Sequence, residues 1–337
     1  MVHQQIIGDA YAHDLTATSD QKQLTARYIE PQIDEIVDRL RRFREEVDQE
    51  YAPKVEADRK AGQSGVYGDI QLGQYPIGFC RHIRERVLAR MVADSFFQDL
   101  VMKGLTLRRV FIFLRGIYFQ NAIQLGNYYL DAANDTVFPE KPKLDWAPIS
   151  ELDYENLDSW ERFAAVSSHY LKVELYPNFL FPLAFPATPF FAIRPNGRID
   201  MLLAQYHIAH KDLGDGMRRT LALLNDTELM SKRLPDCYLR MMEKAFGGNL
   251  FDAFPLEFAP SDPDKIKETV VAEFIQLMDQ PNEKTHSTMK AYFELVEKSV
   301  KIMRTKNLIP DADELKELRQ QGLIPQNVDV IAGLNVD

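Results

Sequence analysis

The stretch LTLRRVFIFLRGIYFQNAIQLGNYYLDA, residues 105–132, decides the fold. Apolar side chains recur along it at steps that suit one side of a long helix, with Ile112, Phe119 and Ala122 among them. The other side carries the polar residues Gln120, Gln124, Asn127 and Asp131. Because this is the most apolar helix that the sequence predicts, we expect it to lie at the centre of the molecule.

Helical periodicity also dominates the sequence on both sides of this segment. Helices are predicted over residues 24–51, 79–102, 152–174, 201–211, 217–224, 226–233, 235–246, 264–279, 284–305 and 311–321. The dipeptide Asn196-Gly197 lies between apolar runs and can close one short hairpin. The expected fold class is therefore all-α, a single large multi-helix bundle with an irregular segment rich in proline and aromatic residues.

The sequence contains no repeat and no sharp change in composition. Its 337 residues suit one or two domains. Residues 1–20 are expected to be disordered or loosely attached, and residues 21–337 to form one helical domain. A C-terminal helical subdomain over residues 259–337 is the alternative. The loop 62–78 holds five glycines and is either a flexible connection or a lid at the edge of a pocket.

The composition excludes several classes of protein. Forty Lys and Arg against fifty Asp and Glu give a net charge of −10, which argues against binding nucleic acid by charge alone. Two cysteines exclude a disulfide scaffold and indicate a reducing compartment. The first residues lack the features of a secretory signal, and no phosphate-loop or dinucleotide motif occurs. We therefore expect a cytoplasmic protein that binds neither nucleic acid nor a nucleotide cofactor.

The longest uncharged run of the chain covers residues 175–193. Four prolines interrupt this run, so it cannot form a membrane-spanning helix. It contributes five candidate pocket residues: Phe179, Phe181, Phe185, Phe190 and Phe191. Aromatic side chains in such a segment can line a small-molecule pocket, pack as ordinary core, or form an exposed patch for a partner protein.

Two histidines are the leading candidates for metal or cofactor ligands. His207 and His210 lie three residues apart on one predicted helix, so their side chains leave the same side of it. Imidazoles at this spacing can hold one metal if another helix supplies a third ligand. The candidates for that ligand are His169, which we select, and Glu174, His82 and Asp212. The alternative is that His207 packs in the core while His210 faces solvent.

Two arginines and one cysteine complete the candidate set. Arg108 and Arg115 lie seven residues apart along the central helix. They either extend to the surface or bind the carboxylate of a ligand or cofactor. Cys80 and His82 could act as nucleophile and base, but side chains two residues apart on a helix diverge.

Three segments carry a family resemblance: YPIGFCRHIRERV at 75–87, LRRVFIFLRGIYFQNAIQLGNYYLD at 107–131 and YHIAH at 206–210. Their order resembles the helical, histidine-ligated haem oxygenases of the tryptophan-dioxygenase-like group, which includes haem-dependent hydroxylases of tyrosine-like substrates. The resemblance implies that His82 is the distal residue and that His207 or His210 is the axial haem ligand. Arg108 or Arg115 would bind a propionate or the substrate carboxylate. The His-x-x-x-Cys pattern of members with thioether-attached haem is missing.

The sequence therefore supports two main hypotheses. The first is an iron-dependent oxidative enzyme, with haem or directly ligated Fe(II), that acts on a small aromatic or amino-acid-like substrate. In that case His82, Arg108 and Arg115 would be catalytic. The second is a metal-free helical interaction protein that uses residues 175–193 as a partner surface. A third hypothesis is a metal-free helical protein that binds an apolar ligand.

Overall fold

A computed structural model describes residues 13–61, 75–247, 256–279 and 283–326. Contacts within the chain divide them into two compact units. Unit 1 runs to Leu157, and unit 2 begins at Asp158. Each unit has buried apolar residues of its own, so we describe each separately.

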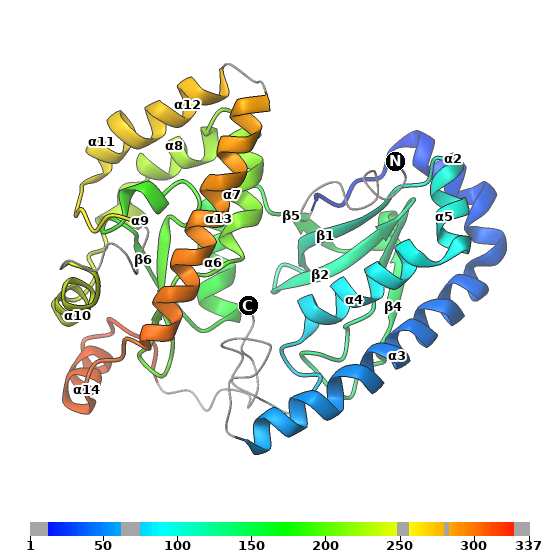
Figure 1. The fold of residues 1–337 in the computed structure, drawn as a ribbon, viewed down its shortest axis with the longest axis horizontal. Helices are drawn as coiled ribbons and strands as arrows, with labels where there is room; N and C mark the ends of the chain where they lie inside the picture. The colour runs from blue at the N-terminus through cyan, green and yellow to red at the C-terminus, as the bar shows by residue number, and fades with distance from the viewer. Residues whose placement is uncertain (1–12, 62–74, 248–255, 280–282, 327–337) are drawn as a thin grey trace. The chain divides into compact units, whose positions relative to one another are not determined.

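Unit 1 is built on an antiparallel sheet of five strands (Figure 1). The strands are β1 (Leu107–Leu114), β2 (Tyr118–Leu125), β3 (Tyr128–Asp131), β4 (Asp145–Pro148) and β5 (Tyr154–Asn156), in the order β4-β3-β2-β1-β5. The sheet curls into a half-barrel, and the protein is 55% helix and 13% strand. The expected all-α fold is therefore wrong, and so is the central helix over residues 105–132.

The reason for this error lies in two turns within the segment. Arg115 and Gly116 both have positive φ angles, 54° and 62°, and end β1. Gly126, with φ 56°, and Asn127 form the two-residue connection from β2 to β3. A Gly-Asn pair between apolar runs favours a tight hairpin. The runs between these turns are rich in aromatic and β-branched residues, which suits buried strands better than one long helix.

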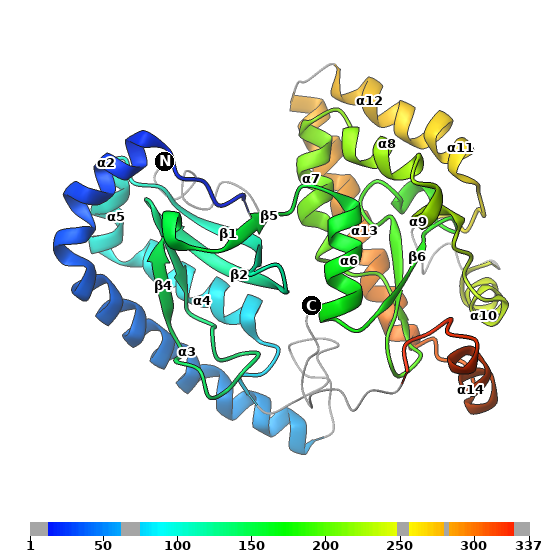
Figure 2. The ribbon, with the colours of Figure 1, turned by 180° about the vertical axis from the view of Figure 1, so that it is seen from behind.

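Helices cover one face of this sheet. Helix α4 (Cys80–Ala93) contacts β1 and β2, and α3 (Ile33–Lys60) packs along α4 (Figure 1). Figure 2 shows the sheet from its opposite face. Shorter elements complete the unit: α2 (Ser19–Tyr28), η1 (Glu30–Gln32), α5 (Ser95–Met102) and η2 (Ile149–Glu151). The helix expected over residues 24–51 is divided among α2, η1 and α3 and continues to Lys60, and the helix expected over residues 79–102 is divided into α4 and α5.

Unit 2 contains a small antiparallel sheet of β6 (Glu174–Pro177), β7 (Phe190–Ile193) and β8 (Ile199–Asp200). Helix α6 (Trp160–Tyr170) packs against β6, and α13 (Glu283–Lys306) against β8. The other elements are η3 (Pro182–Ala184), α7 (Gln205–Gly214), α8 (Arg218–Leu224), α9 (Thr227–Ser231), α10 (Asp236–Phe246), α11 (Pro263–Lys265), the π-helix η4 (Ile266–Val271), α12 (Ala272–Met278) and α14 (Ala312–Gln320). The short hairpin expected at Asn196-Gly197 is confirmed by the pairing of β7 with β8.

Within the described ranges, no helix combines the length and the apolar character that crossing a membrane requires. The uncharged run at 175–193 instead supplies β6, η3 and β7 to the interior of unit 2.

Candidate functional site

The candidate site begins at the first residue of α4. Cys80 occupies this position, and its side chain is only 6% exposed. Phe79 precedes it as the N-cap residue and makes no side-chain capping hydrogen bond. The first N–H groups of a helix lack partners inside the helix. One of them, the backbone N–H of Arg81, lowers the pKa of the neighbouring Cys80 thiol.

A side-chain amide from the sheet donates a hydrogen bond to the same sulfur. Asn121 lies on β2, and its Nδ2 is 3.4 Å from the Sγ of Cys80. The Asn121 side chain is 3% exposed. Its carbonyl oxygen Oδ1 accepts no hydrogen bond from any residue that the structure describes. A buried acceptor without a partner is costly, so the thiol–amide pair of Cys80 and Asn121 leaves one polar atom available to a ligand.

Opposing effects set the pKa of the Cys80 thiol. Burial is the largest and raises this pKa, and the negative charge of Asp131 raises it further. The hydrogen bond from Asn121, the charge of Arg84 and the backbone N–H of Arg81 lower it. The net direction is upward, so the resting group is a protonated thiol. Hydrogen-bond donors are nevertheless in place to stabilise a thiolate once it forms.

A buried carboxyl group lies at the end of the neighbouring strand β3. Asp131 accepts a 2.6 Å hydrogen bond from Gln120 Nε2 and a 2.7 Å hydrogen bond from the backbone N–H of Ala133. The hydroxyl of Tyr129 lies 3.4 Å from the same carboxyl group. Burial raises the pKa of Asp131 to about 7. This carboxyl group can therefore gain or lose a proton near neutral pH, as a general acid or base must.

The thiol and the carboxyl group approach β2 from its two faces. Gln120 and Asn121 are neighbours on the strand, so their side chains point to opposite faces of the sheet. Asn121 faces α4 and Cys80, whereas Gln120 holds Asp131 on the other face. The charge of Asp131 still acts on the thiol. The two titratable groups are thus coupled electrostatically.

Of the three residues expected to be catalytic, His82 shares the first turn of α4 with Cys80, whereas the two arginines lie on β1 and in the turn after it. His82 is in the first turn of α4, half-buried, with its ring 5.7 Å from that of Phe79. Arg108 lies on β1, where it donates to Gln124 at 2.8 Å and to the backbone oxygen of Asp14 at 2.8 Å. Arg115 is exposed in the turn after β1. Arg108 therefore anchors the segment before α2 to the sheet.

The metal-binding prediction is wrong for the described part of the chain. No group of three or more His, Cys, Asp or Glu side chains in those ranges could hold a metal ion. His169 is exposed on α6, while His207 and His210 are half-buried on α7. The His210 ring faces Phe293 at 5.9 Å between ring centroids. Nothing in the described residues supports haem or an oxygenase.

The five phenylalanines expected to line a pocket belong to the interior of unit 2. Each is at most 9% exposed. Phe179 stacks on Phe185 with their centroids 6.3 Å apart, and Phe181 packs edge-on against Phe191 at 6.2 Å. Phe190 packs against Trp160. These side chains therefore contribute to the core and not to an exposed partner surface.

Sequence reasoning noted Cys80 but missed its partners. It placed Asn121 and Asp131 on a helix, where neither could be matched with a residue on another element. The Gly-Asn turn after β2 is the signal that could have placed Asn121 and Asp131 on adjacent strands. Recognising this turn would also have shown that α4 packs against a sheet and not against a central helix.

No protein-family model matches the chain, and comparison with curated proteins and with solved structures finds no match. The resemblance to haem oxygenases accordingly stays a prediction.

Proposed function

We propose that unit 1 is a thiol-dependent enzyme in which Cys80 attacks an electrophilic acyl carbon. The observation that carries this proposal is the thiol–amide pair at the start of α4. The Asn121 amide donates to the sulfur over 3.4 Å, and its own carbonyl oxygen has no partner among the described residues. An N–H group of a substrate bound at the sulfur could donate a hydrogen bond to the Asn121 carbonyl oxygen.

The second cysteine of the chain provides an internal comparison. Cys237 lies at the second position of α10, is 7% exposed and is a free thiol, as Cys80 is. Burial raises the pKa of both thiols. Backbone N–H groups lower both thiol pKa values. A side-chain hydrogen-bond donor lowers the pKa of Cys80 but not that of Cys237. Among the hydrogen-bond donors at the two sites, the Asn121 side-chain amide therefore distinguishes Cys80.

The proposed reaction is acyl transfer through a thioester. The Cys80 sulfur forms a bond to the acyl carbon, and the bond from that carbon to the leaving group breaks. The thiol proton ends on the leaving group. Water then hydrolyses the thioester, which releases the acid and restores the thiol. The uncapped N–H groups of α4 can stabilise the negative charge that develops on the acyl oxygen.

Asp131 is proposed to tune the reaction through its charge and not as a proton carrier, because it lies on the opposite face of β2 from Cys80. A pKa of about 7 keeps both of its protonation states populated near neutral pH. Its negative charge opposes the thiolate, so protonation of Asp131 favours ionisation of Cys80. A reducing compartment such as the cytoplasm would keep the thiol in its reactive form.

The test uses the full-length protein and p-nitrophenyl acetate as a generic acyl donor. Mass spectrometry of peptides locates the acetyl group after brief exposure, in the wild type and in Cys80→Ala and Cys237→Ala. We expect acetylation of Cys80 in the wild type and in Cys237→Ala. Both proteins should also release p-nitrophenol from the ester faster than Cys80→Ala does. Equal labelling of both cysteines, or unchanged release from Cys80→Ala, would overturn the proposal.

A further inference from the structure

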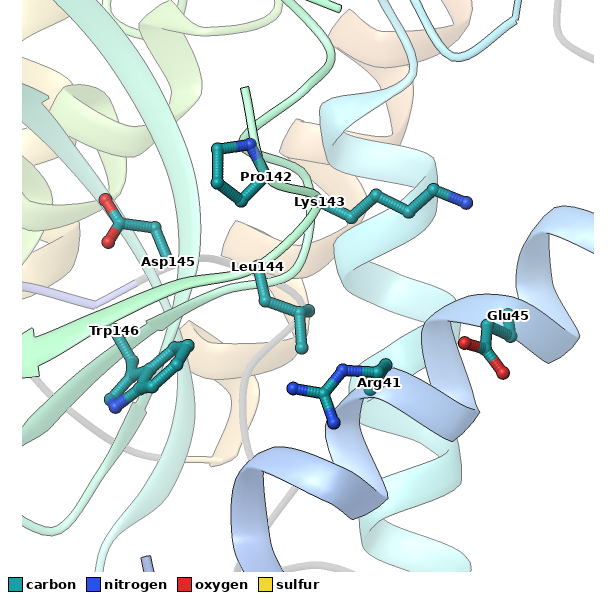
Figure 3. A pocket seen from close by; sticks show the side chains of 7 residues that line it. All are labelled: Arg41, Glu45, Pro142, Lys143, Leu144, Asp145 and Trp146. Carbon is teal, nitrogen blue, oxygen red and sulfur yellow. The ribbon is translucent and has the colours of Figure 1, made fainter. Parts of the chain in front are cut away.

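A pocket of about 600 Å³ lies between α3 and β4 in unit 1 (Figure 3). Strand β4 forms one edge of the five-stranded sheet, because its only strand neighbour among the described residues is β3. Arg41 of α3 points toward this edge, and Leu144 and Trp146 point back toward the helix. Trp146 is 41% exposed, which is unusual for so large an apolar side chain.

The cations at this pocket already have partners on the protein. Arg41 forms a 2.5 Å ion pair with Asp38, and Lys143 forms a 2.6 Å ion pair with Asp48. Glu45 and Asp145 also line the pocket and add negative charge. An anionic ligand such as a phosphate would therefore meet carboxylates as well as cations that are already paired. The charges favour a ligand without negative charge.

The apolar groups give the pocket a preference for a flat ligand. An indole face on one side and a guanidinium on the other can both contact an aromatic ring, the first by stacking and the second by a cation–π interaction. Leu144 adds aliphatic contacts between them, and Pro142 also lines the pocket. The volume is within the range of small-molecule pockets.

We propose that the pocket between α3 and β4 binds an uncharged planar aromatic ring between Trp146 and Arg41. This site is separate from the thiol–amide pair and does not depend on the proposed reaction. The ring belongs either to a free small molecule or to a side chain of an extended peptide. Alternate residues of an edge strand turn their backbone N–H and C=O groups outward, so a peptide could also pair with β4.

Saturation-transfer NMR on the full-length protein tests the proposal with three probes. The first is p-cresol, and the second is 4-methylcyclohexanol, which has the same substituents on a ring that is not planar. The third is the capped tripeptide Ac-Thr-Tyr-Thr-NH2, which carries the p-cresol ring on a peptide backbone. Affinities are measured for the wild type and for Trp146→Leu, Arg41→Met and Phe138→Leu. Phe138 is the matched control, because it is exposed in unit 1 but does not line the pocket.

We expect p-cresol to bind the wild type and Phe138→Leu equally, and to bind Trp146→Leu and Arg41→Met about three- to tenfold more weakly. We expect 4-methylcyclohexanol to bind more weakly than p-cresol. Tighter binding of the tripeptide than of p-cresol would identify a peptide as the source of the ring, and equal binding would identify a free molecule. The proposal is wrong if p-cresol and the tripeptide both fail to bind, if both pocket variants bind p-cresol as the wild type does, or if the two ring probes bind equally.

Discussion

At the scale of single residues, the central feature is a buried thiol that accepts a hydrogen bond from the Asn121 amide. Donors favour the charged form of the group that accepts from them, whereas burial favours the neutral form. At Cys80 burial is the larger effect, so the thiol is protonated at rest. Its reactivity should therefore depend strongly on the Asn121 amide, which is the larger of the two donor effects.

Replacement of Asn121 by leucine should make Cys80 less reactive. Leucine has a similar shape but no donor, so the thiol pKa rises further and less thiolate is present at pH 8. We expect alkylation of Cys80 by iodoacetamide to slow by about three- to tenfold, since one pKa unit changes the thiolate fraction about tenfold. Mass spectrometry follows both cysteines in one sample, and Cys237 should react at its wild-type rate. An unchanged rate at Cys80 would show that Asn121 does not stabilise the thiolate.

Asp131 should make folding stability depend on pH. Its carboxyl pKa is about 7 in the folded protein, against an ordinary value of 3.8. Below about pH 4 the group is protonated in both the folded and the unfolded states, and its full contribution to stability is present. Between about pH 4 and about pH 7 the unfolded state loses its proton first, so stability falls as pH rises.

The variant Asp131→Asn removes this titration. The variant's free energy of unfolding should exceed that of the wild type, and this excess should be larger at pH 8 than at pH 5. For a shift of about three pKa units, the change in the excess has an upper limit of about 4 kcal/mol. Urea unfolding at both pH values measures the difference. Glu140→Gln, at an exposed position of the same unit, is the control and should follow the wild type. A constant difference between Asp131→Asn and the wild type at both pH values would contradict the assigned pKa.

At the scale of elements, the β2–β3 connection lies in close contact with the end of α2. Gly126 has φ 56°, and a Cβ added there would lie 2.5 Å from Thr25 Oγ1 and 2.9 Å from Ile29 Cδ1. The backbone N–H of Asn127 donates to the same Thr25 hydroxyl at 2.8 Å. The turn is thus fixed against the C-terminal half of α2, and a side chain would have to separate the two.

Gly126→Ala should therefore be strongly destabilising. Backbone strain at positive φ adds to the steric clash, and we expect a loss of about 2–4 kcal/mol in the free energy of unfolding. Gly104→Ala is the matched control, because φ is 94° but the added Cβ would meet only Leu24 Cδ1, at 3.5 Å. The control should lose about 1 kcal/mol. Equal losses for the two variants, measured by urea unfolding, would show that the clash at Gly126 is relieved by movement.

The sequence predicted helices far better than strands. The helices after residue 217 begin and end within about three residues of their predicted limits, because caps such as Asp262 and Asp311 mark their starts. The segment 105–132 was misread because its central strands are buried on both faces, so polar and apolar residues do not alternate along β1 and β2. In such a segment only the turns distinguish strands from a buried helix.

The same limit explains the candidate site. Cys80 could be placed at the start of a helix from its preceding Gly-Phe pair and the apolar spacing that follows. Asn121 and Asp131 could not be assigned to it, since their relation to Cys80 depends on strand register and on the packing of α4 over β2. The histidines drew attention because His-x-x-His spacing is a local pattern, yet a metal site also needs ligands from other elements.

At the scale of the whole molecule, the spectrum of the purified protein addresses the haem prediction directly. No three-ligand metal group occurs among the described residues, so we expect no stoichiometric iron bound directly by side chains after purification. A haem needs only one axial protein ligand, so a Soret band, after purification or after incubation with haem, is the separate test of the haem prediction. Absorption spectroscopy and elemental analysis of one sample provide the measurement. A Soret band that disappears in His207→Ala or His210→Ala would support the haem interpretation.

The two units should respond separately to core substitutions, because each contains its own buried apolar residues. Ile123 is fully buried in unit 1, and Phe190 is 1% exposed in unit 2. Ile123→Ala and Phe190→Ala should each cost about 2–5 kcal/mol through loss of packing and creation of a cavity. Hydrogen exchange followed by mass spectrometry then reports where protection is lost. Peptides from residues 107–131 should exchange faster in Ile123→Ala, and those from 160–193 should exchange faster in Phe190→Ala. Loss of protection throughout both units in either variant would show that the chain unfolds as one cooperative body.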